Sequence, residues 1–496
     1  MSNETGVRDA PTTVGGIFKE LGPGLIIAGS IVGSGELIAT TLTGAEAGFW
    51  LIWLILIGCV IKVFVQLEIG RYTITTGHTA LEGLSRLPGR KPMGIHWAVW
   101  LWLVMFVATV GQYGGIVGAV GQSIGITAPL TQEGRAFNEA ADLATKAKIA
   151  AVIEQFDEGG EGAAAPQEVA LPDPGMDVYY WAILMTLVTC VILYRGKYNM
   201  IEKTVMILVG GFTVLSMINV IMLQINPVWA VKWSDIGQGF SFRLPPPEPG
   251  LYPVATALAT FGIIGMAAGE LIYYPYWCLE KGYAKHIGPP EDSEEWRNRA
   301  KGWIRVMRWD AWLSMVVYTV STLVFYILGA AVLSRAGLRP EGSELIRTLS
   351  AMYEPVFGEF AVGLFLVGSV AVLYSTFFVG SASMALVASD AAEIVSRNWK
   401  RSLSRIKARP FFNIALPLIA FVIFVFLPNP KVLVLVAGIT NTFMLPILGF
   451  AALYYRYRCT GEAFKPRPLW DVFLWLSALA LLLVGLWLAS RLLGLS

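Results

Sequence analysis

The chain has 496 residues, of which 55% are hydrophobic and only 15% are charged. Soluble globular proteins carry about 25% charged residues, so this composition excludes a soluble enzyme and a disordered chain. The formal net charge of +2 gives no basis for nucleic-acid binding. Residues 1–20 are polar and contain no apolar signal-peptide core. The cysteines are scattered and form neither a metal-binding spacing nor a disulfide framework: Cys59, Cys190, Cys278 and Cys459.

Long apolar stretches predict an all-α integral membrane protein. A stretch of about 20 apolar residues can cross the bilayer as a helix, and these stretches are continuous rather than alternating, as the strands of a membrane barrel would be. We expect about eleven spans, at residues 23–43, 48–70, 96–123, 178–194, 204–224, 253–279, 310–333, 360–387, 410–427, 431–454 and 469–490.

Positive charge predicts the orientation, because Lys and Arg are concentrated in cytoplasmic loops. Of the 37 Lys and Arg residues, 26 fall in segments on the side of the N-terminus, 10 fall on the opposite side, and Lys62 lies inside a span. The N-terminus is therefore expected in the cytoplasm, in a multi-pass protein of the inner or plasma membrane.

Two segments between spans are rich in polar residues. The longest, 124–177, is expected outside the cell as a helix over residues 131–156 followed by a flexible acidic stretch at 158–166. The segment 281–308 is dense in both charge signs, which is typical of a solvated helix, and it lies where a gate linker would lie.

The first and sixth spans share an interruption. Residues 31–38 and 265–272 each contain small residues followed by Gly-Glu-Leu-Ile, at the same place in two successive five-span groups. An odd number of spans gives the two groups opposite orientations, which is a transporter architecture. The predicted organisation is a cytoplasmic segment (1–22), two inverted five-helix repeats (23–224 and 253–454) and one extra helix (469–490).

Glycine at both interruptions favours non-helical backbone, with a substrate bound where the helices break. We expect the backbone of Gly33 to Glu36 to be non-helical. Glu36 and Glu270 are carboxylates in mid-membrane, which normally face the bundle interior with a partner. The alternative is that the glycines only permit close helix packing and the acids lie near the membrane interface.

Further short matches lie at the ends of the first two spans and in the tenth: Gly22-Pro23-Gly24, Thr43-Gly44-Ala45, Gln66-Leu67-Glu68, Thr76-Gly77 and Leu445-Pro446. In these residues, and over most of its length, the chain resembles the Nramp family of divalent-metal transporters. The resemblance implies a LeuT-type fold with eleven or twelve spans and a cytoplasmic N-terminus.

The chain departs from the family at the motifs that carry chemistry. The first-span signature Asp-Pro-Gly-Asn, whose Asp and Asn bind metal, is replaced by Gly33-Ser34-Gly35-Glu36. The sixth-span signature Met-Pro-His-Asn reads Met266-Ala267-Ala268-Gly269, which keeps only the methionine. The third-span acids linked to proton movement have no counterpart in 109–113, and the gating glutamine corresponds to Gly438.

The expected substrate site combines both interruptions with the tenth span: Gly33, Ser34, Gly35, Glu36, Met266, Ala267, Gly269, Glu270 and Asn441. For a divalent metal, Glu36 and Glu270 would supply hard oxygen ligands and Met266 a soft thioether, which favours transition metals.

Charge partners of this site are proposed from two other spans. Lys62 lies within the second span, where a lysine must pair or lose its proton. It is a salt-bridge partner of Glu36 or Glu270, or a titrating carrier of the coupling proton. The alternative is a purely structural ion pair or a snorkelling side chain. Ser375 and Thr376 of the eighth span are candidates for holding sodium by analogy with sodium-coupled LeuT-type transporters, or they form helix–helix hydrogen bonds.

The sequence therefore predicts a secondary active transporter for a divalent cation of the manganese, iron or magnesium class. One alternative is a related transporter for a small organic or anionic solute, coupled to sodium or protons, which Lys62 would favour. Another is a membrane sensor that binds without cycling. An enzyme is not predicted, because no nucleophile–base set or phosphate loop is present, and neither a cofactor nor a protein partner is indicated.

Overall fold

The structure is a computed structural model that describes residues 6–157, 171–195, 198–248, 250–398 and 403–494. In these residues all regular structure is helical, as predicted. Ten described segments are long and apolar enough to cross a membrane, and the apolar stretch Val209–Ile225 is a shorter eleventh. Every predicted span overlaps one of these segments, although the seventh begins earlier, at Glu294 rather than at residue 310, and the eighth ends later, at Arg397 rather than at residue 387.

The first span is built from α2 (Pro23–Ile31), η1 (Val32–Thr40) and α3 (Thr41–Ala47), and the sixth from α11 (Pro253–Ile263) and α12 (Ala268–Glu280). The remaining spans are α4 (Ile52–Thr76), α6 (Trp97–Thr127), α8 (Asp177–Arg195), α9 (Tyr198–Met222), α14 (Glu294–Leu328) with η4 (Gly329–Ser334), α17 (Ala361–Asn398), α18 (Arg405–Phe426), α19 (Pro430–Tyr454) and α20 (Pro468–Leu492). The α-helices outside the spans are α1 (Val14–Glu20), α5 (Ala80–Leu84), α7 (Gln132–Asp157), α10 (Trp233–Gly239), α13 (Tyr283–Ile287), α15 (Leu345–Ser350) and α16 (Glu354–Phe357).

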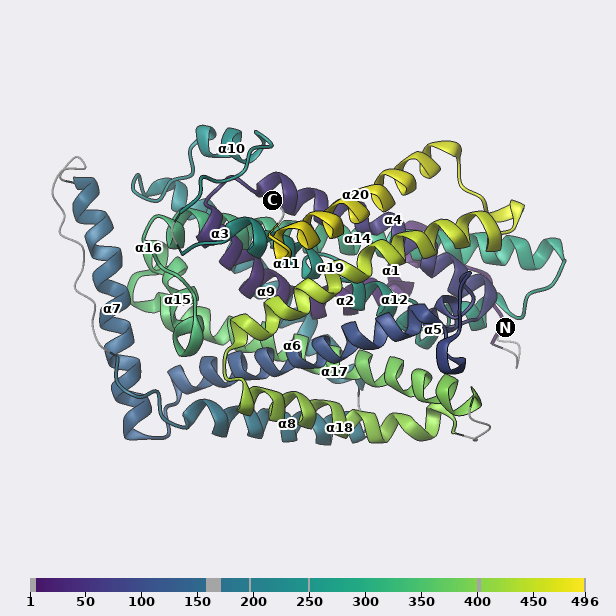
Figure 1. The fold of residues 1–496 in the computed structure, drawn as a ribbon, viewed down its shortest axis with the longest axis horizontal. Helices are drawn as coiled ribbons and strands as arrows, with labels where there is room; N and C mark the ends of the chain where they lie inside the picture. The colour runs from purple at the N-terminus through teal and green to yellow at the C-terminus, as the bar shows by residue number, and fades with distance from the viewer. Residues whose placement is uncertain (1–5, 158–170, 196–197, 249, 399–402, 495–496) are drawn as a thin grey trace.

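Two groups of helices surround the first and sixth spans. Helix α14 packs against α2, η1, α3 and α4, whereas α6 packs against α8, α17, α18 and α19. Figure 1 shows α8 and α18 running along one long edge of the molecule. Glycines bring these helices together: a Cβ on Gly114 would lie 2.5 Å from the Ala420 carbonyl, and one on Gly121 would lie 2.3 Å from the Val178 carbonyl. Small residues at helix contacts are the usual means of association in membranes.

The two ends of the bundle carry different elements. Helices α7, α15 and α16 lie at one end, and α5 and the N-terminus lie at the other (Figure 1). The Lys and Arg distribution predicts a cytoplasmic N-terminus, and an odd number of spans would put the two termini on opposite sides of a membrane.

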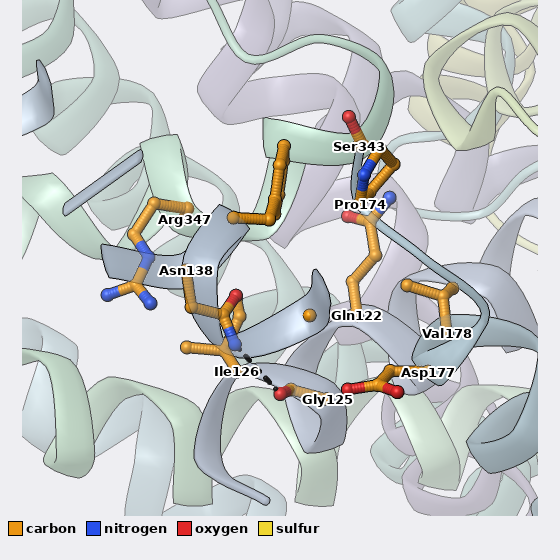
Figure 2. A pocket seen from close by; sticks show the side chains of 11 residues that line it. Gln122, Gly125, Ile126, Asn138, Pro174, Asp177, Val178, Ser343 and Arg347 are labelled. Carbon is orange, nitrogen blue, oxygen red and sulfur yellow. Dashed lines mark hydrogen bonds between the residues drawn. The ribbon is translucent and has the colours of Figure 1, made fainter. Parts of the chain in front are cut away.

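Helix α7 confirms the helical part predicted for the segment 124–177. Figure 2 shows how it meets the bundle at a small cavity, where Asn138 donates to the Gly125 carbonyl (3.0 Å) and Arg347 lies beside it. Arg347 also pairs with Asp142 of α7 (3.1 Å). Asp177 accepts from the backbone N–H groups of Leu130 (2.8 Å) and Thr131 (3.0 Å), which fixes the turn before α7. The acidic stretch 158–166 lies outside the described residues.

The charged segment 281–308 is helical over α13 and from Glu294 onward, and it carries ion pairs such as that of Arg297 with Asp292 (2.5 Å), as predicted. Only its first part connects two helices, because α14 already begins at Glu294 and continues into the seventh span. Ser293 caps this helix by accepting from the N–H of Trp296 (3.1 Å). Trp296 and Trp303 are buried, so one face of the segment packs against the protein instead of being solvated all round.

Candidate functional site

The sixth span breaks between Ile263 and Ala268, as the glycines predicted. Ile264 has extended backbone angles, and Gly265 has φ +54°, a left-handed conformation that favours glycine. A Cβ on Gly265 would also lie only 3.2 Å from the Cα of Cys59. The break frees carbonyl groups at the end of α11 and N–H groups at the start of α12 in the middle of the bundle.

The first span does not break, so the prediction of non-helical backbone at Gly33 to Glu36 is wrong. Residues Val32–Thr40 instead form a π-helix continuous with α2 and α3. The wider turn is supported by the Thr40 hydroxyl, which donates to the carbonyl of Gly35 (2.9 Å). Glycine is required here for space: a Cβ on Gly33 would lie 2.1 Å from the Thr376 hydroxyl. Single π-helical turns within α-helices are frequent at functional sites.

Glu36 extends from this π-helix to the break in the sixth span. Its Oε1 accepts from the N–H of Gly265 (3.3 Å) and from the Thr322 hydroxyl (2.9 Å). The side chain has 0% exposure, and its Oε2 has no hydrogen-bond partner in the described part of the chain. Buried polar atoms are nearly always paired, so an unpaired carboxylate oxygen indicates a missing cation, water or proton.

Lys62 approaches the same break from α4. Its ammonium donates to the carbonyls of Phe261 (2.5 Å) and Ile264 (2.9 Å) and lies 4.7 Å from the centre of the Phe261 ring. A direct salt bridge to Glu36 or Glu270 is not formed within the described residues, although both carboxylates act electrostatically on the ammonium. The carbonyl end of a broken helix is therefore the immediate partner of this lysine.

The start of α12 provides the other predicted residues. Met266 and Ala267 lie buried in the break, and Glu270 lies in the first turn of α12, partly exposed within the bundle and within electrostatic range of Glu36. Asn441 of α19 accepts from the N–H of Gly269 (3.0 Å), and thus caps α12 from the tenth span. The structure therefore brings the first, second, sixth and tenth spans together around the break.

The third and eighth spans enclose the π-helix. Gln112 of α6 donates to the hydroxyl of Ser34 (3.0 Å). Ser375 of α17 bonds to the carbonyl of Gly29 (3.0 Å), which is the helix–helix role considered for it. The neighbouring Thr376 hydroxyl is buried without a hydrogen-bond partner among the described residues. A sodium-binding role for Ser375 and Thr376 stays a prediction.

Among the described residues, no group of three or more His, Cys, Asp or Glu side chains is arranged to hold a metal. Ligation of a cation by Glu36, Glu270 and Met266, together with carbonyls of the broken helix, stays a prediction. Mixed side-chain and backbone ligation of this kind is typical of ion sites at discontinuous membrane helices.

The outer end of the first span is held by contacts that the sequence did not reveal. Glu46 accepts from the Thr256 hydroxyl (2.6 Å) and pairs with Lys431 (3.4 Å), so it ties α3 to α11 and α19. Helices α11 and α19 touch through backbone: a Cβ on Gly438 would lie 2.4 Å from the carbonyl of Ala259. Gly438, at the family's gating position, is therefore a close-packing residue in this structure.

Replacing Gly438 by alanine should lower the melting temperature and the rate of any transport, because the new Cβ meets a backbone carbonyl that cannot rotate away. Overpacking of this kind costs about 1–3 kcal/mol. Gly363→Ala on α17 is the matched control, because a Cβ added there would have no other atom within 4 Å. Equal melting temperatures for the two variants would contradict the close contact between α11 and α19.

Asp310 is a second residue that sequence reasoning missed. Its buried carboxylate accepts from the N–H groups of Gly22 (2.9 Å) and Gly24 (2.6 Å) and from the Tyr274 hydroxyl (3.0 Å). It thereby joins the start of α2 to α12 and α14 at the inner end of the bundle. The signal was present, since a carboxylate stands at the edge of the seventh span and a Gly-Pro-Gly sequence stands at the edge of the first.

A comparison with protein families shows the family of the chain. A family profile described as natural resistance-associated macrophage protein-like (Nramp) matches residues 168–491. The chain belongs to the Nramp family. It is thus a multi-pass integral membrane protein of a transporter family, as the sequence resemblance predicted.

Solved structures with the same fold agree with this assignment. A histidine-to-alanine mutant of the manganese transporter of Eremococcus coleocola is similar with a TM-score of 0.60 and 15% identity, covering 97% of this chain and 88% of that chain. MhsT in complex with L-phenylalanine is similar with a TM-score of 0.54 and 16% identity, covering 97% and 99% of the two chains. No curated protein matches. The predicted LeuT-type fold is confirmed.

Proposed function

We propose that this Nramp protein is a secondary active transporter of the inner or plasma membrane that moves a divalent metal cation by alternating access. The cation would bind between η1 and the break that separates α11 from α12. Manganese, iron and magnesium are the candidate ions, with Glu36, Glu270 and Met266 as ligands.

The observation that carries this proposal is the carboxylate of Glu36. It is fully buried, it bridges the first span to the Gly265 N–H at the break, and its Oε2 is unpaired among the described residues. A cation at Oε2 would satisfy this oxygen and lower the cost of burying the charge. Met266 lies buried in the break, and its soft thioether as a ligand would favour manganese or iron over magnesium.

Alternating access requires that contacts at the two ends of the first span open in turn. At the outer end, Glu46 contacts Thr256 and Lys431, and at the inner end Asp310 holds Gly22 and Gly24. We infer that the organisation into two inverted repeats, 23–224 and 253–454, lets each set of contacts break while the central site stays assembled.

A second candidate function rests on Lys62. An ammonium already bonded to the Phe261 and Ile264 carbonyls repels a metal and would favour a small organic or anionic solute, with sodium or proton coupling. A sensor that binds without cycling is the third possibility.

The test is uptake by liposomes that contain the purified full-length protein and an internal metal-sensitive dye. We expect saturable Mn²⁺ uptake above that of protein-free liposomes, with competition by Fe²⁺ and weaker competition by Mg²⁺. Uptake of labelled amino acids and other small solutes is measured in parallel.

The outcomes separate the three functions. Saturable flux of an organic solute without flux of any divalent metal would favour the second candidate. Binding of Mn²⁺ by calorimetry with no flux of any solute would favour the sensor. Either result would contradict metal transport.

A further inference from the structure

The carbonyl end of α11 has the chemistry of a cation site. In an unbroken helix the Phe261 carbonyl would accept from the N–H of Gly265, four residues on. That N–H instead donates to Glu36 (3.3 Å), because the helix ends at Ile263. The Phe261 and Ile264 carbonyls are thus released at the negative end of the helix dipole, and such helix ends coordinate cations in membrane transporters.

The ammonium of Lys62 occupies this site. It donates to both released carbonyls, at 2.5 and 2.9 Å, and to no other described group. Gly58, one turn before Lys62, lets α4 lie close to the break. A Cβ on Gly58 would lie 2.8 Å from the Phe261 ring and 3.3 Å from the Ile264 side chain. Lys62 is also among the largest fully buried side chains of the described chain, so its charge is not shared with water.

Charge balance makes this ammonium a competitor of any free cation. The titratable groups within electrostatic range of Lys62 are the Cys59 thiol of its own helix and the carboxylates of Glu270 on α12 and Glu36 on η1. With Lys62, Glu36 and Glu270 ionised, these three side chains carry a net charge of −1. A divalent cation beside them would leave the buried site at +1, whereas without Lys62 the same two carboxylates would neutralise it. A net charge is costly at this depth in a membrane.

We propose that Lys62 is a tethered cation that occupies the α11 carbonyls in place of a bound ion and sets which charge the site accepts. A transported cation would enter by displacing the ammonium from the Phe261 and Ile264 carbonyls. In the absence of substrate, the ammonium would fill the site and let the empty carrier reorient without a co-transported ion. This inference rests on the proposed function for its substrate, but the carbonyl site can be tested with sodium alone.

The experiment compares the full-length protein in detergent with Lys62→Gln, Lys62→Met and Lys62→Arg. Glutamine keeps N–H donors for the carbonyls and loses the charge, methionine loses both, and arginine keeps the charge. Lys19→Gln, at an exposed lysine on α1, is the matched control. Calorimetry measures Mn²⁺ affinity, and thermal unfolding is followed in NaCl against choline chloride at equal ionic strength.

We expect Lys62→Gln and Lys62→Met to bind Mn²⁺ at least about tenfold more tightly, because a like charge close to the ion is removed. Both should also gain a sodium-dependent rise in melting temperature that the wild type, Lys62→Arg and Lys19→Gln lack. If methionine prevents folding, glutamine decides the question, since it keeps a polar side chain with N–H donors but no charge.

Two results would overturn the proposal. One is a wild type that binds Mn²⁺ together with a folded Lys62→Gln protein whose Mn²⁺ affinity is unchanged or weaker. The other is no gain of sodium dependence in either neutral variant. If no variant binds Mn²⁺ but the neutral variants gain sodium binding, the tethered cation stands and metal transport fails. If the wild type transports Mn²⁺ and the neutral variants behave like it, metal transport stands and the tethered cation fails.

Discussion

Replacing Glu36 by glutamine should abolish saturable Mn²⁺ uptake and weaken Mn²⁺ binding by at least about 100-fold. The change preserves shape, and the amide oxygen can still accept from the Gly265 N–H and the Thr322 hydroxyl. It removes the negative charge that would neutralise the ion in a medium where water cannot do so. Binding is measured by calorimetry and transport by the liposome assay.

The control for this variant is Glu154→Gln, because Glu154 is an exposed glutamate on α7, outside the membrane spans. Thermal unfolding separates a binding defect from a folding defect: a neutral amide is cheaper to bury than a carboxylate, so Glu36→Gln should be at least as stable as the wild type. Wild-type Mn²⁺ affinity in a folded Glu36→Gln protein would remove Glu36 from the site.

Replacing Asp310 by alanine should destabilise the protein by about 3–5 kcal/mol and suppress transport. The Gly22 and Gly24 N–H groups and the Tyr274 hydroxyl would all lose their acceptor. A larger residue at position 24 could not fill the space, since a Cβ on Gly24 would lie 2.7 Å from the main-chain carbonyl of Asp310. The start of α2 would then detach from α14, which is measured as a lower melting temperature.

Asp310→Asn is the informative second variant. Its amide oxygen can accept from one of the two glycines, whereas its NH₂ group faces the other as a donor, so we expect an intermediate loss of stability. Asp9→Ala, at an exposed aspartate before α1, is the control. A melting temperature of Asp310→Ala equal to that of the control would show that Asp310 does not anchor the first span.

Most of the fold was predictable because the bilayer imposes simple rules. A membrane helix must satisfy its own backbone and present apolar side chains over a fixed length. Each of the eleven predicted spans accordingly coincides with a helix. The charged segment before the seventh span is helical, as predicted, but the sequence did not show that Trp296 and Trp303 bury one face of it, because burial depends on which element packs there.

The broken sixth span was predicted correctly, but the backbone predicted for the first span was wrong. Glycine content and matched position correctly indicated a broken sixth span, but the same signal in the first span produced a π-helix. Glycine only permits an unusual backbone. Whether the backbone forms a π-helix or a break depends on the residues packed against the glycine. Thr376 fills the space beside Gly33, whereas Tyr318 and Cys59 pack against Gly265.

The amino-acid sequence by itself determined the membrane class, the spans and the family, because hydropathy and motifs are properties of short stretches of chain. Only the tertiary structure decided that Lys62 meets the Phe261 and Ile264 carbonyls and that Asp310 caps α2. These partners are separated by about 200 residues or more. A carbonyl becomes available where a helix ends, and the side chain that reaches it is selected by how the helices pack.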